Sequence, residues 1–355
     1  MNVTPSVAIV ILNWNTAHYL TRFLSSVLET SYANKRIYVI DNNSSDNSIA
    51  LLQQHYPSVH IIPMNKNLGF AGGYNYGLAR IKADYYLIVN SDIEVTPGFI
   101  EPLVTLLENN PEIGICQPKL LSLTDRQMFE YAGAAGGWMD RLGFPFTRGR
   151  VLTTIEKDNG QYDATEEIFW ATGGCMCFSA KLFAEVGGFY DYYFMHQEDI
   201  DLCWRVRNIG YSIYACPSSV VYHLGGGTLS WENYLKTFLT FRNNYILLSR
   251  NLPFFQALLI VSLRMMTDFL GVFYFLLRKE RGVSRAMLKA IVSYFQWLFI
   301  HRKTQKNKQP KGWPRTNCIY QGTILFPYFL RNKRKFTELV PTKSPFHAGS
   351  PLKEI

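Results

Sequence analysis

The sequence predicts an α/β fold in which a mostly parallel, Rossmann-like sheet is flanked by helices. Short continuous apolar runs such as VAIVIL (residues 7–12) are typical of strands that are buried on both faces. Segments with apolar residues at helical spacing alternate with these runs at short intervals, as in a parallel sheet covered by helices. Polar residues gather directly after the runs, at the carboxyl ends of strands where such sheets bind ligands.

The elements of this sheet are predicted in order along the first third of the chain. Ser44, Ser45 and Asp46 are candidate N-caps of the second helix, and Pro97 opens the fourth. The predicted strands are residues 7–12, 36–42, 59–64, 85–90 and 113–121, and the predicted helices are residues 18–30, 49–56, 74–81 and 97–110. Beyond about residue 120 glycines and aromatic residues loosen the pattern, and past about residue 240 the chain is helical, apolar and basic.

The charge divides the 355-residue chain into two parts. Residues 1–240 carry 16 Lys and Arg against 23 Asp and Glu, whereas residues 241–355 carry 20 against 4. We therefore expect two parts with different functions: one domain over residues 1–240 and a helical, membrane-associated region over residues 241–355. A basic tail also suits nucleic acid, but the aliphatic bulk of this one favours a membrane surface, and no nucleic-acid partner is predicted.

Residues 254–277 form an apolar run long enough to span a bilayer. Arg264 and Asp268 interrupt it, four residues apart and able to pair on one helix face. We favour a helix that lies in the membrane interface, beside the basic residues that follow it, over a spanning or a buried packing helix. Residues 301–315 are a further basic segment that can contact anionic lipid.

The glycines at positions 69, 72, 73 and 77 do not spell a dinucleotide fingerprint, and the chain has no P-loop sequence. A dehydrogenase or a P-loop kinase is therefore not predicted. Two interpretations of the glycines stay open: a helix start whose N–H groups approach a phosphate, and a tight turn required for packing.

Two acidic clusters are candidates for chemistry. Asp92 and Glu94 follow an apolar strand and suit Mg²⁺ or Mn²⁺ shared with a diphosphate, or they are ordinary loop acids. Glu198, Asp199 and Asp201 lie in an apolar segment, where an ionised group is costly unless it is paired. Asp201 can pair with a residue one helical turn on, Arg205, which leaves Glu198 and Asp199 at the mouth of the cleft as candidates for a general base.

His223 follows an apolar strand and precedes three glycines, so it is either structural or a further metal ligand beside a mobile loop. The six cysteines fit no metal-binding template, and the N-terminal apolar run is too short for a signal peptide. We expect reduced thiols and a location at the cytoplasmic face of the inner membrane, peripheral or monotopic.

Taken together, the motifs resemble family 2 of the inverting glycosyltransferases, which have the GT-A fold, and in particular the rhamnosyltransferase-like branch of bacterial surface-polysaccharide synthesis. The resemblance covers about residues 7–230. Asn90-Ser91-Asp92 stands where the family has its DxD motif, so Asn90 replaces the first Asp. The motifs that carry the resemblance are VAIVILNWN, VIDNNSSDNS, NKNLGFAGGYNYGL, LIVNSDIEVTPGF, ATGGCMCFSAKLFAEVGGF, FMHQEDIDLCWR and VVYHLGGGT.

The resemblance implies a role for each matching residue. Asp199 would be the general base, with Glu198 beside it in the ED motif. A divalent cation, Mn²⁺ or Mg²⁺, would be held by Asp92 and His223. The nucleotide sugar would contact Asn13, Asn15, Asp41, Asn67, Gly69, Phe70, Gly72, Gly73, Asn75, Asn90 and Ser91, and the acceptor would contact Trp170, Gly173, Gly174 and His196.

The implied activity is inverting transfer of a sugar, rhamnose or a similar one, from a dTDP- or UDP-linked donor. The acceptor would be a hydroxyl of a glycan or of a lipid-linked glycan. Two alternatives stay open at this point: a non-catalytic scaffold of a polysaccharide assembly complex, and a sugar nucleotidyltransferase, whose early Gly-rich loop with Arg or Lys is absent here. The sequence makes no prediction of the oligomeric state.

Overall fold

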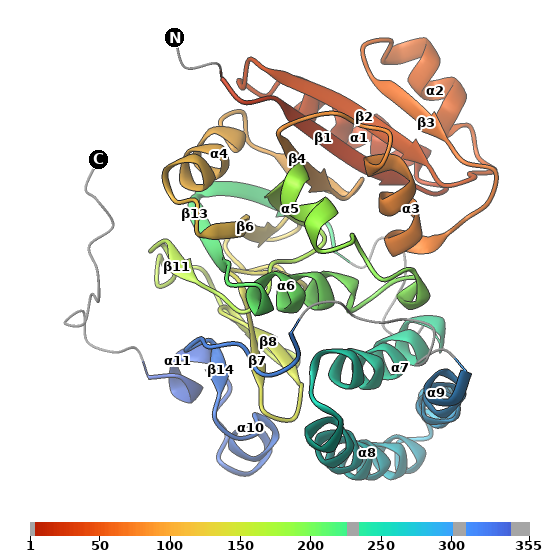
Figure 1. Ribbon diagram of the computed structural model, residues 1–355, viewed down its shortest axis with the longest axis vertical. Coiled ribbons are helices and arrows are strands. Elements are labelled where there is room, and N and C mark those ends of the chain that lie inside the picture. Colours follow the sequence, from red (N-terminus) through yellow and green to blue (C-terminus); the bar gives the residue numbers. More distant parts are fainter. Residues whose placement is uncertain (1–3, 226–233, 301–309, 342–355) are drawn as a thin grey trace.

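A mixed nine-stranded sheet runs through the centre of the computed structural model, which describes residues 4–225, 234–300 and 310–341 (Figure 1). The α/β class is confirmed, and each of the five predicted strands is found within one residue of its expected ends. The strand order is β11-β13-β6-β12-β4-β1-β2-β3, with β5 paired to β13. These strands are β1 (Val7–Asn13), β2 (Lys35–Asp41), β3 (His60–Pro63), β4 (Tyr85–Val89), β5 (Ile93–Val95), β6 (Ile113–Ser122), β11 (Glu166–Glu167), β12 (Cys175–Ser179) and β13 (Ser212–His223).

The direction of the strands changes at β12. Strands β3, β2, β1 and β4 are parallel, as expected from the βα alternation, but β12 runs antiparallel between β4 and β6. A long connection with several short strands separates β6 from β12 in the chain. The direction of β12 is therefore not fixed by a short right-handed crossover. The sheet is therefore mixed, with a parallel half that carries the first polar clusters.

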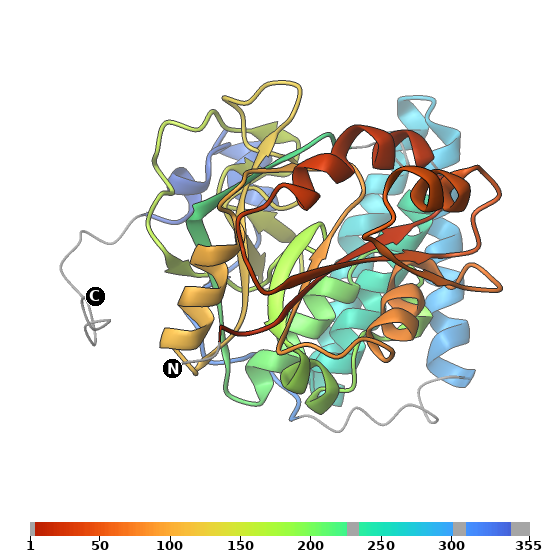
Figure 2. The same cartoon turned by 90° about the horizontal axis from the view of Figure 1, so that it is seen from above.

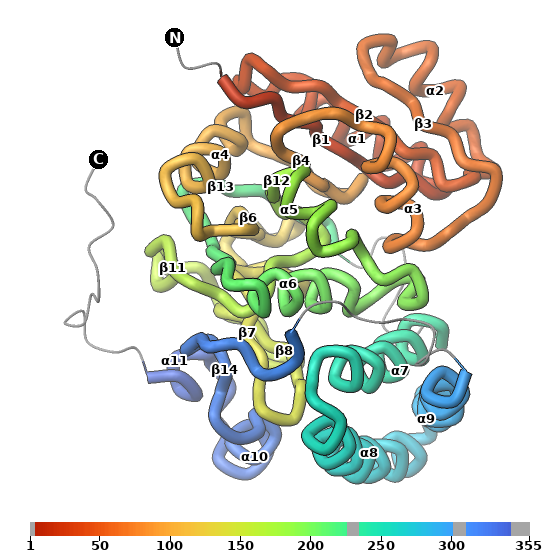
Figure 3. Tube along the Cα trace, in the orientation of Figure 1, coloured from red at the N-terminus to blue at the C-terminus, as the bar shows by residue number. Residues whose placement is uncertain are grey.

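Helices cover both faces of the sheet, which explains why the strands are continuously apolar. In β1, Val7, Ile9 and Ile11 face one core and Ala8 and Val10 face the other. The first core is closed by α1 (Ala17–Leu28), α2 (Ser48–His55) and α4 (Ile100–Asn109), and the second by α3 (Gly69–Leu78), α5 (Ala180–Glu185), α6 (Glu198–Asn208) and α7 (Tyr234–Asn251). The tube trace in Figure 3 shows α6 between this sheet and α7.

Helix α3 begins five residues before the predicted start, because the glycine-rich stretch is helical and is not a separate turn. The structure explains its glycines by close packing. A Cβ atom at Gly77 would lie 2.0 Å from the Ile40 side chain, and one at Gly73 would lie 2.7 Å from Leu12. Helix α3 can thus approach β1 and β2 only with glycine at these positions.

A second, five-stranded sheet, which the sequence did not indicate, lies beside the first. Its strands are only two to four residues long, and their order is β10-β9-β8-β7-β14. They are β7 (Gly137–Asp140), β8 (Pro145–Thr147), β9 (Arg150–Val151), β10 (Thr154–Ile155) and β14 (Ile319–Tyr320). Strand β14 comes from the C-terminal region, so this region is built into the fold together with the N-terminal domain.

The C-terminal region is helical, as predicted, and its helices pack against the N-terminal part of the chain. Helices α8 (Phe254–Leu277) and α9 (Arg281–Ile300) stack on α7, and α10 (Leu325–Leu330) and α11 (Phe336–Leu339) lie by the small sheet. Figure 2 shows the cyan and light-blue helices on one side of the molecule and the dark-blue elements on the other. The expected boundary at residue 240 falls inside α7, and that division of the chain stays a prediction.

All six cysteines are free and buried, in agreement with the expectation of reduced thiols. Arg264 and Asp268 form the predicted pair on α8, at 3.0 Å. Part of the basic segment 301–315 and the glycines that follow Gly225 lie outside the described residues, so the predicted loop and lipid contact at these places stay predictions.

Candidate active site

The carboxyl ends of β1 and β2 bring Asn13 and Asp41 together, as predicted. The two residues are register partners in the parallel pair, and the Asn13 amide donates a 2.8 Å hydrogen bond to the Asp41 carboxylate. Both side chains are buried. The Asn13 amide also lies 3.0 Å from the Ser44 hydroxyl, so a polar cluster is held at the edge of the sheet.

Asn15 and Asn67 organise the loops around this cluster. Asn15 has a left-handed backbone (φ 56°), and its side-chain oxygen accepts from the backbone N–H of Ser45 at 2.7 Å. The Asn67 oxygen accepts from the N–H of Gly69 at 2.8 Å and from the Asn42 amide at 3.0 Å. Asn42 in this way fastens the end of β2 to the start of α3.

The start of α3 is closed by protein. The N–H groups of Phe70 and Ala71 both donate to the Phe194 carbonyl, at 2.6 and 3.2 Å, and the Gly69 N–H is bound by Asn67. Gly69 has φ +70°, and a Cβ atom there would lie 2.4 Å from the Phe194 carbonyl oxygen. Of the two interpretations of the glycines, packing accounts for the described geometry, since the N–H groups of Gly69, Phe70 and Ala71 at the helix start already have acceptors.

The remaining α3 residues differ in position. Gly72 abuts Leu68, and Asn75 turns away from the β1–β2 edge to bond the backbone of Phe189 and the side chain of Asp191. The Asn75 amide already donates to Phe189 and Asp191. Its predicted contact with a nucleotide stays a prediction.

The end of β4 carries the Asn90-Ser91-Asp92 motif. The Asn90 N–H donates to the Gly174 carbonyl at 2.8 Å, and Ser91 is half-buried beside it. Asp92 then enters the interior, because the chain returns as β5 and pairs with β13. Its carboxylate lies 3.1 Å from Nε2 of His223, the last residue of β13.

Glu130 completes this group and was not predicted from the sequence. Its Oε1 lies 3.2 Å from Nδ1 of His223, and its Oε2 accepts from the N–H groups of Ala132 and Gly133. Asp92, Glu130 and His223 are all buried. No local motif marks Glu130; only the pairing of distant segments brings it to β13.

The charges of the three groups are strongly linked. Burial would lower the pKa of His223, but Glu130 and Asp92 outweigh it and raise that pKa to about 10. Burial would raise the pKa values of Asp92 and Glu130, yet His223 brings both below their ordinary values. In the protonated form that this raised pKa favours, the His223 imidazole lies between the carboxylates of Asp92 and Glu130.

Asp92 Oδ1 and His223 Nε2 are atoms of the kinds that Mg²⁺ and Mn²⁺ take as ligands. No ready-made cluster of three or more His, Cys, Asp or Glu ligands is found within residues 4–225, 234–300 and 310–341. However, neighbouring ligands of an octahedral ion with bonds of about 2.1 Å lie about 3 Å apart, which matches the 3.1 Å between Asp92 Oδ1 and His223 Nε2. Glu130 at Nδ1 is placed as the outer carboxylate that orients a ligating histidine.

Glu198 and Asp199 lie in the first turn of α6, where the helix dipole favours carboxylates. Asp199 accepts from the Gly173 N–H at 2.9 Å and from the Ile200 N–H at 2.8 Å. Burial raises the pKa of Asp199 against these bonds, and burial together with Asp199 raises the pKa of Glu198 well above its usual range. One Glu198 oxygen is buried with no hydrogen-bond partner among the described residues.

Asp201 has a different role, as its spacing from Arg205 predicted. It is fully buried and contacts Arg205 at 2.8 Å, Asn251 at 2.8 Å and Arg250 at 3.4 Å. Burial opposes its ionisation, but the two arginines outweigh burial and the pKa of Asp201 is lowered. Its bonds join α6 to α7.

The segment before α6 is strained. Phe194, His196 and Gln197 all have left-handed backbones, with φ of 64°, 69° and 74°. Such conformations cost about 1–3 kcal/mol each in residues other than glycine and are typical of functional sites. His196 is largely enclosed: burial lowers its pKa to about 4, and its Nε2 has no partner among the described residues.

Gly173 and Gly174 connect the two halves of the site. A Cβ atom at Gly173 would lie 2.9 Å from Phe70 and 3.5 Å from Asp199, and one at Gly174 would lie 3.7 Å from Asn90 and 3.9 Å from His223. Trp170, three residues earlier, is only 4% exposed and donates its indole N–H to the Trp138 carbonyl. The predicted acceptor residues are thus split: the glycines line the site, whereas the Trp170 ring has little surface left for a sugar.

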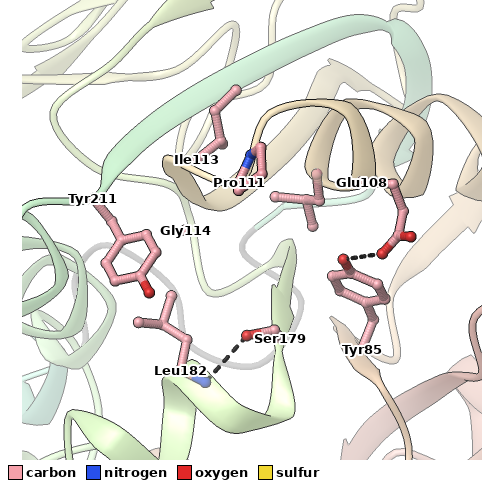
Figure 4. A pocket seen from close by; sticks show the side chains of 9 residues that line it. Tyr85, Glu108, Pro111, Ile113, Gly114, Ser179, Leu182 and Tyr211 are labelled. Atoms are coloured by element: carbon pink, nitrogen blue, oxygen red, sulfur yellow. Dashed lines mark hydrogen bonds between the residues drawn. The ribbon is translucent and has the colours of Figure 1, made fainter.

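A hollow of about 250 Å³ lies at the opposite, amino-terminal edge of β4 and β6 (Figure 4). Tyr85, Glu108, Ser179 and Tyr211 line it, and Tyr85 donates to Glu108. It contains none of the predicted site residues, and we assign the site by the polar contacts above.

Comparisons with known proteins give the family of this chain. Residues 8–186, half of the chain, match the family described as Glycosyl transferase family 2. An N-acetylglucosaminyl-diphospho-decaprenol L-rhamnosyltransferase of Mycobacterium tuberculosis is 26% identical over 243 residues, which cover 64% of this chain and 78% of that protein. A low-salt glycan biosynthesis hexosyltransferase of Haloferax volcanii is 23% identical, over 59% of this chain and 66% of that protein.

Two solved structures share the fold. A mannosyltransferase from Pyrobaculum calidifontis in complex with GDP-Man and Mn²⁺ has a TM-score of 0.52 at 12% identity, over 83% of this chain and 90% of that one. GalNAc-T7 with UDP, GalNAc and Mn²⁺ has a TM-score of 0.56 at 14% identity, over 86% of this chain and 57% of that one. The GT-A-like fold is confirmed, and the chain belongs to glycosyl transferase family 2.

Proposed function

We propose that the protein is an inverting glycosyltransferase that moves rhamnose or a similar sugar from a dTDP- or UDP-linked donor. The acceptor is a hydroxyl of a glycan or lipid-linked glycan in cell-surface polysaccharide synthesis. One observation carries the proposal. Gly173 and Gly174 lie between a half-buried carboxylate, Asp199, on one side and the Asp92–His223 pair on the other.

In the proposed reaction, Asp199 accepts the proton of the acceptor hydroxyl while that oxygen forms a bond to the anomeric carbon. The bond from this carbon to the diphosphate breaks, and its electron pair leaves with the diphosphate oxygen. Asp92 and His223 would hold Mn²⁺ or Mg²⁺, which when bound neutralises charge on the departing diphosphate. The hydrogen bonds from Gly173 and Ile200 keep the carboxylate oriented for proton transfer.

A thermal-shift screen against UDP, dTDP, GDP and CDP, each with and without Mn²⁺, tests the donor class. Because a ligand that binds the native state stabilises it by mass action, a nucleotide at 100 times its Kd adds about 2.7 kcal/mol to the free energy of unfolding. We expect a metal-dependent rise in melting temperature with dTDP or UDP. No shift with any nucleotide would contradict the proposal and favour a non-catalytic scaffold.

Glu130→Gln sharpens the same screen, because it keeps the shape of the side chain beside His223 and removes its charge. Loss of such an outer carboxylate typically costs about 10- to 100-fold in metal affinity. The Mn²⁺ concentration that gives half of the nucleotide shift should rise by that factor. Glu185→Gln, an exposed change on α5, is the matched control and should leave the Mn²⁺ dependence unchanged.

We also propose that the protein lies on the cytoplasmic face of the inner membrane through α8. Within the described residues, α8 is the one helix with the length and apolarity to cross a membrane. Its Arg264–Asp268 pair faces the protein, where Arg264 donates to Asn244 at 2.6 Å and Tyr245 donates to Asp268 at 2.7 Å. These contacts support a helix that lies along the protein surface.

The outer face of α8 supports the same orientation. It exposes Phe255, Leu259 and Leu270, and α10 at the same end of the molecule exposes Phe326 and Phe329 (Figure 1). Basic residues border this apolar surface and suit anionic headgroups: Arg278, Lys279 and Arg281 follow α8, and Arg331, Lys333 and Arg334 follow α10.

The membrane proposal predicts that the wild type floats with vesicles that contain anionic lipid and is released by alkaline carbonate. The double variant Leu259→Glu/Leu270→Glu should lose flotation, since it places two charges on the apolar face. Gln53→Glu/Gln54→Glu adds the same charge on α2, at the far end of the molecule in Figure 1, and should float normally. Release by detergent alone would instead favour a spanning α8.

A further inference from the structure

Asn243 of α7 lies beneath the strained segment that precedes the proposed base. Its side-chain amide nitrogen is 2.9 Å from the carbonyl oxygen of Tyr193 and 2.8 Å from those of Met195 and His196. The side chain is fully buried. One amide group, which has two N–H hydrogens, is thus shared among three carbonyl oxygens within residues 193–196.

These carbonyls lie in the same stretch as the residues with positive φ, Phe194, His196 and Gln197. A backbone of this kind persists only where its surroundings hold it. Asn243 binds the carbonyls of Met195 and His196, and it shares the Tyr193 carbonyl with Arg242, whose guanidinium lies 3.1 Å away. The α3 backbone binds the Phe194 carbonyl. The segment therefore lies between two helices, and it is bonded to the side chain of Asn243 on α7 and to the backbone of α3.

The position of Asp199 follows from this segment. Helix α6 begins at Glu198, directly after Gln197, so the direction of its first turn is set by the φ angles of residues 194–197. Asp199 must keep its 2.9 Å bond to the Gly173 N–H to face the acceptor hydroxyl. A displacement of the first turn by 1 Å would be enough to lower a rate about 100-fold.

We propose that Asn243 is a positioning residue for the base: it fixes the left-handed segment 194–197 and through it the carboxylate of Asp199. This inference rests on the proposed function of Asp199. Asn243 itself touches no reacting atom. Sequence spacing gives no sign of the role, because the residue is more than forty positions from the segment and lies in a region expected to serve the membrane.

Asn243→Ala tests the proposal, with Ser249→Ala as the matched control. Ser249 lies on the same helix, is buried and bonds Tyr294 of α9, without contact to the segment. In Asn243→Ala we expect kcat for sugar transfer to fall about 10- to 100-fold. The KM for the nucleotide sugar and the nucleotide-induced thermal shift should stay within about twofold, because Asn13 and Asp41 are untouched. Ser249→Ala should keep the wild-type kcat.

Hydrogen exchange provides a readout that does not depend on catalysis. The amides of Ile200 and Asp201, which donate to the Asp199 carboxylate and to the Gln197 carbonyl, should exchange faster in Asn243→Ala and at the wild-type rate in Ser249→Ala. A folded Asn243→Ala with wild-type kcat and wild-type exchange would overturn the proposal. Asn243→Ser keeps a hydroxyl donor and should show a smaller loss of kcat; it replaces the alanine variant if that variant does not fold.

The outcomes also separate this inference from the proposed function. If the wild type transfers no sugar, the proposed function fails, and the exchange experiment still decides whether Asn243 holds the segment. If the wild type is active and the Asn243 variants lose kcat and nucleotide binding together, Asn243 supports the fold in general and the positioning role is contradicted.

Discussion

Asp199→Asn is expected to lower sugar transfer by about 10²- to 10⁴-fold while nucleotide binding survives, because the amide keeps the shape of the carboxylate but cannot accept the proton. The hydrogen bond from the Gly173 N–H can persist to the amide oxygen, so the loop geometry should be retained. Transfer is measured as kcat with a defined acceptor, and binding as the nucleotide-induced thermal shift. Loss of both would assign Asp199 to binding or folding instead.

Glu198→Gln is the matched comparison, since the two carboxyl groups are adjacent and both have raised pKa values. Glu198 is buried with one oxygen unpartnered, so its neutral form is favoured and Gln is a close mimic of that form. We expect this variant to keep most of its activity. If Glu198→Gln lowered kcat as much as Asp199→Asn does, Glu198 would be the better candidate for the general base.

The pH dependence of stability tests whether Glu198 is neutral in the folded protein. A carboxyl group whose pKa is raised on folding contributes stability that is fully present below its unfolded-state pKa and is lost as the pH rises through the folded-state pKa. Glu198→Gln should therefore unfold at a higher temperature than the wild type at neutral or alkaline pH. This gain should shrink as the pH falls from the folded-state pKa of Glu198 toward its unfolded-state pKa, and it should be absent below the latter.

The sequence predicted the parallel half of the sheet well because each strand there is a local signal. Residues 7–12 are apolar on both faces, and helices on both sides require that pattern wherever the strand lies. The small second sheet was not predicted because strands of two residues, such as β9 and β10, leave no periodicity to detect. The predicted start of α3 was wrong because its glycines are required by close packing against Leu12 and Ile40, which lie far away in the sequence.

The site divides in the same way. Asp92, Asp199 and His223 stand in recognisable motifs, and the structure brings each to the same region around residues 173–174. Glu130 and Asn243 act on those residues from distant segments, and their own neighbours in sequence carry no motif. The positions of Glu130 and Asn243 depend on contacts between segments that are distant in sequence. A local sequence pattern carries no signal for such contacts.

Asp201→Ala is expected to destabilise the fold by about 3–5 kcal/mol, because it leaves buried positive charge without its partner. Arg205 is 3% exposed and Arg250 lies beside the same carboxylate, so solvent cannot replace the lost anion. The variant also removes the acceptor of the Asn251 amide, which joins α6 to α7. The midpoint of urea unfolding measures the loss, and Glu185→Gln, an exposed carboxylate on α5, should shift it by no more than about 0.5 kcal/mol.

Acid should narrow the difference between Asp201→Ala and the wild type. The pKa of Asp201 is lowered on folding, so its contribution is present above the unfolded-state pKa and is lost as the pH falls through the folded-state pKa. At neutral pH the full difference should therefore appear, and in strong acid the two proteins should converge. If Asp201→Ala kept wild-type stability but lost transfer, Asp201 would belong with Asp199 to the reacting groups. The three carboxylates of α6 would then no longer divide, as their contacts indicate, into one base, one neutral neighbour and one structural ion pair.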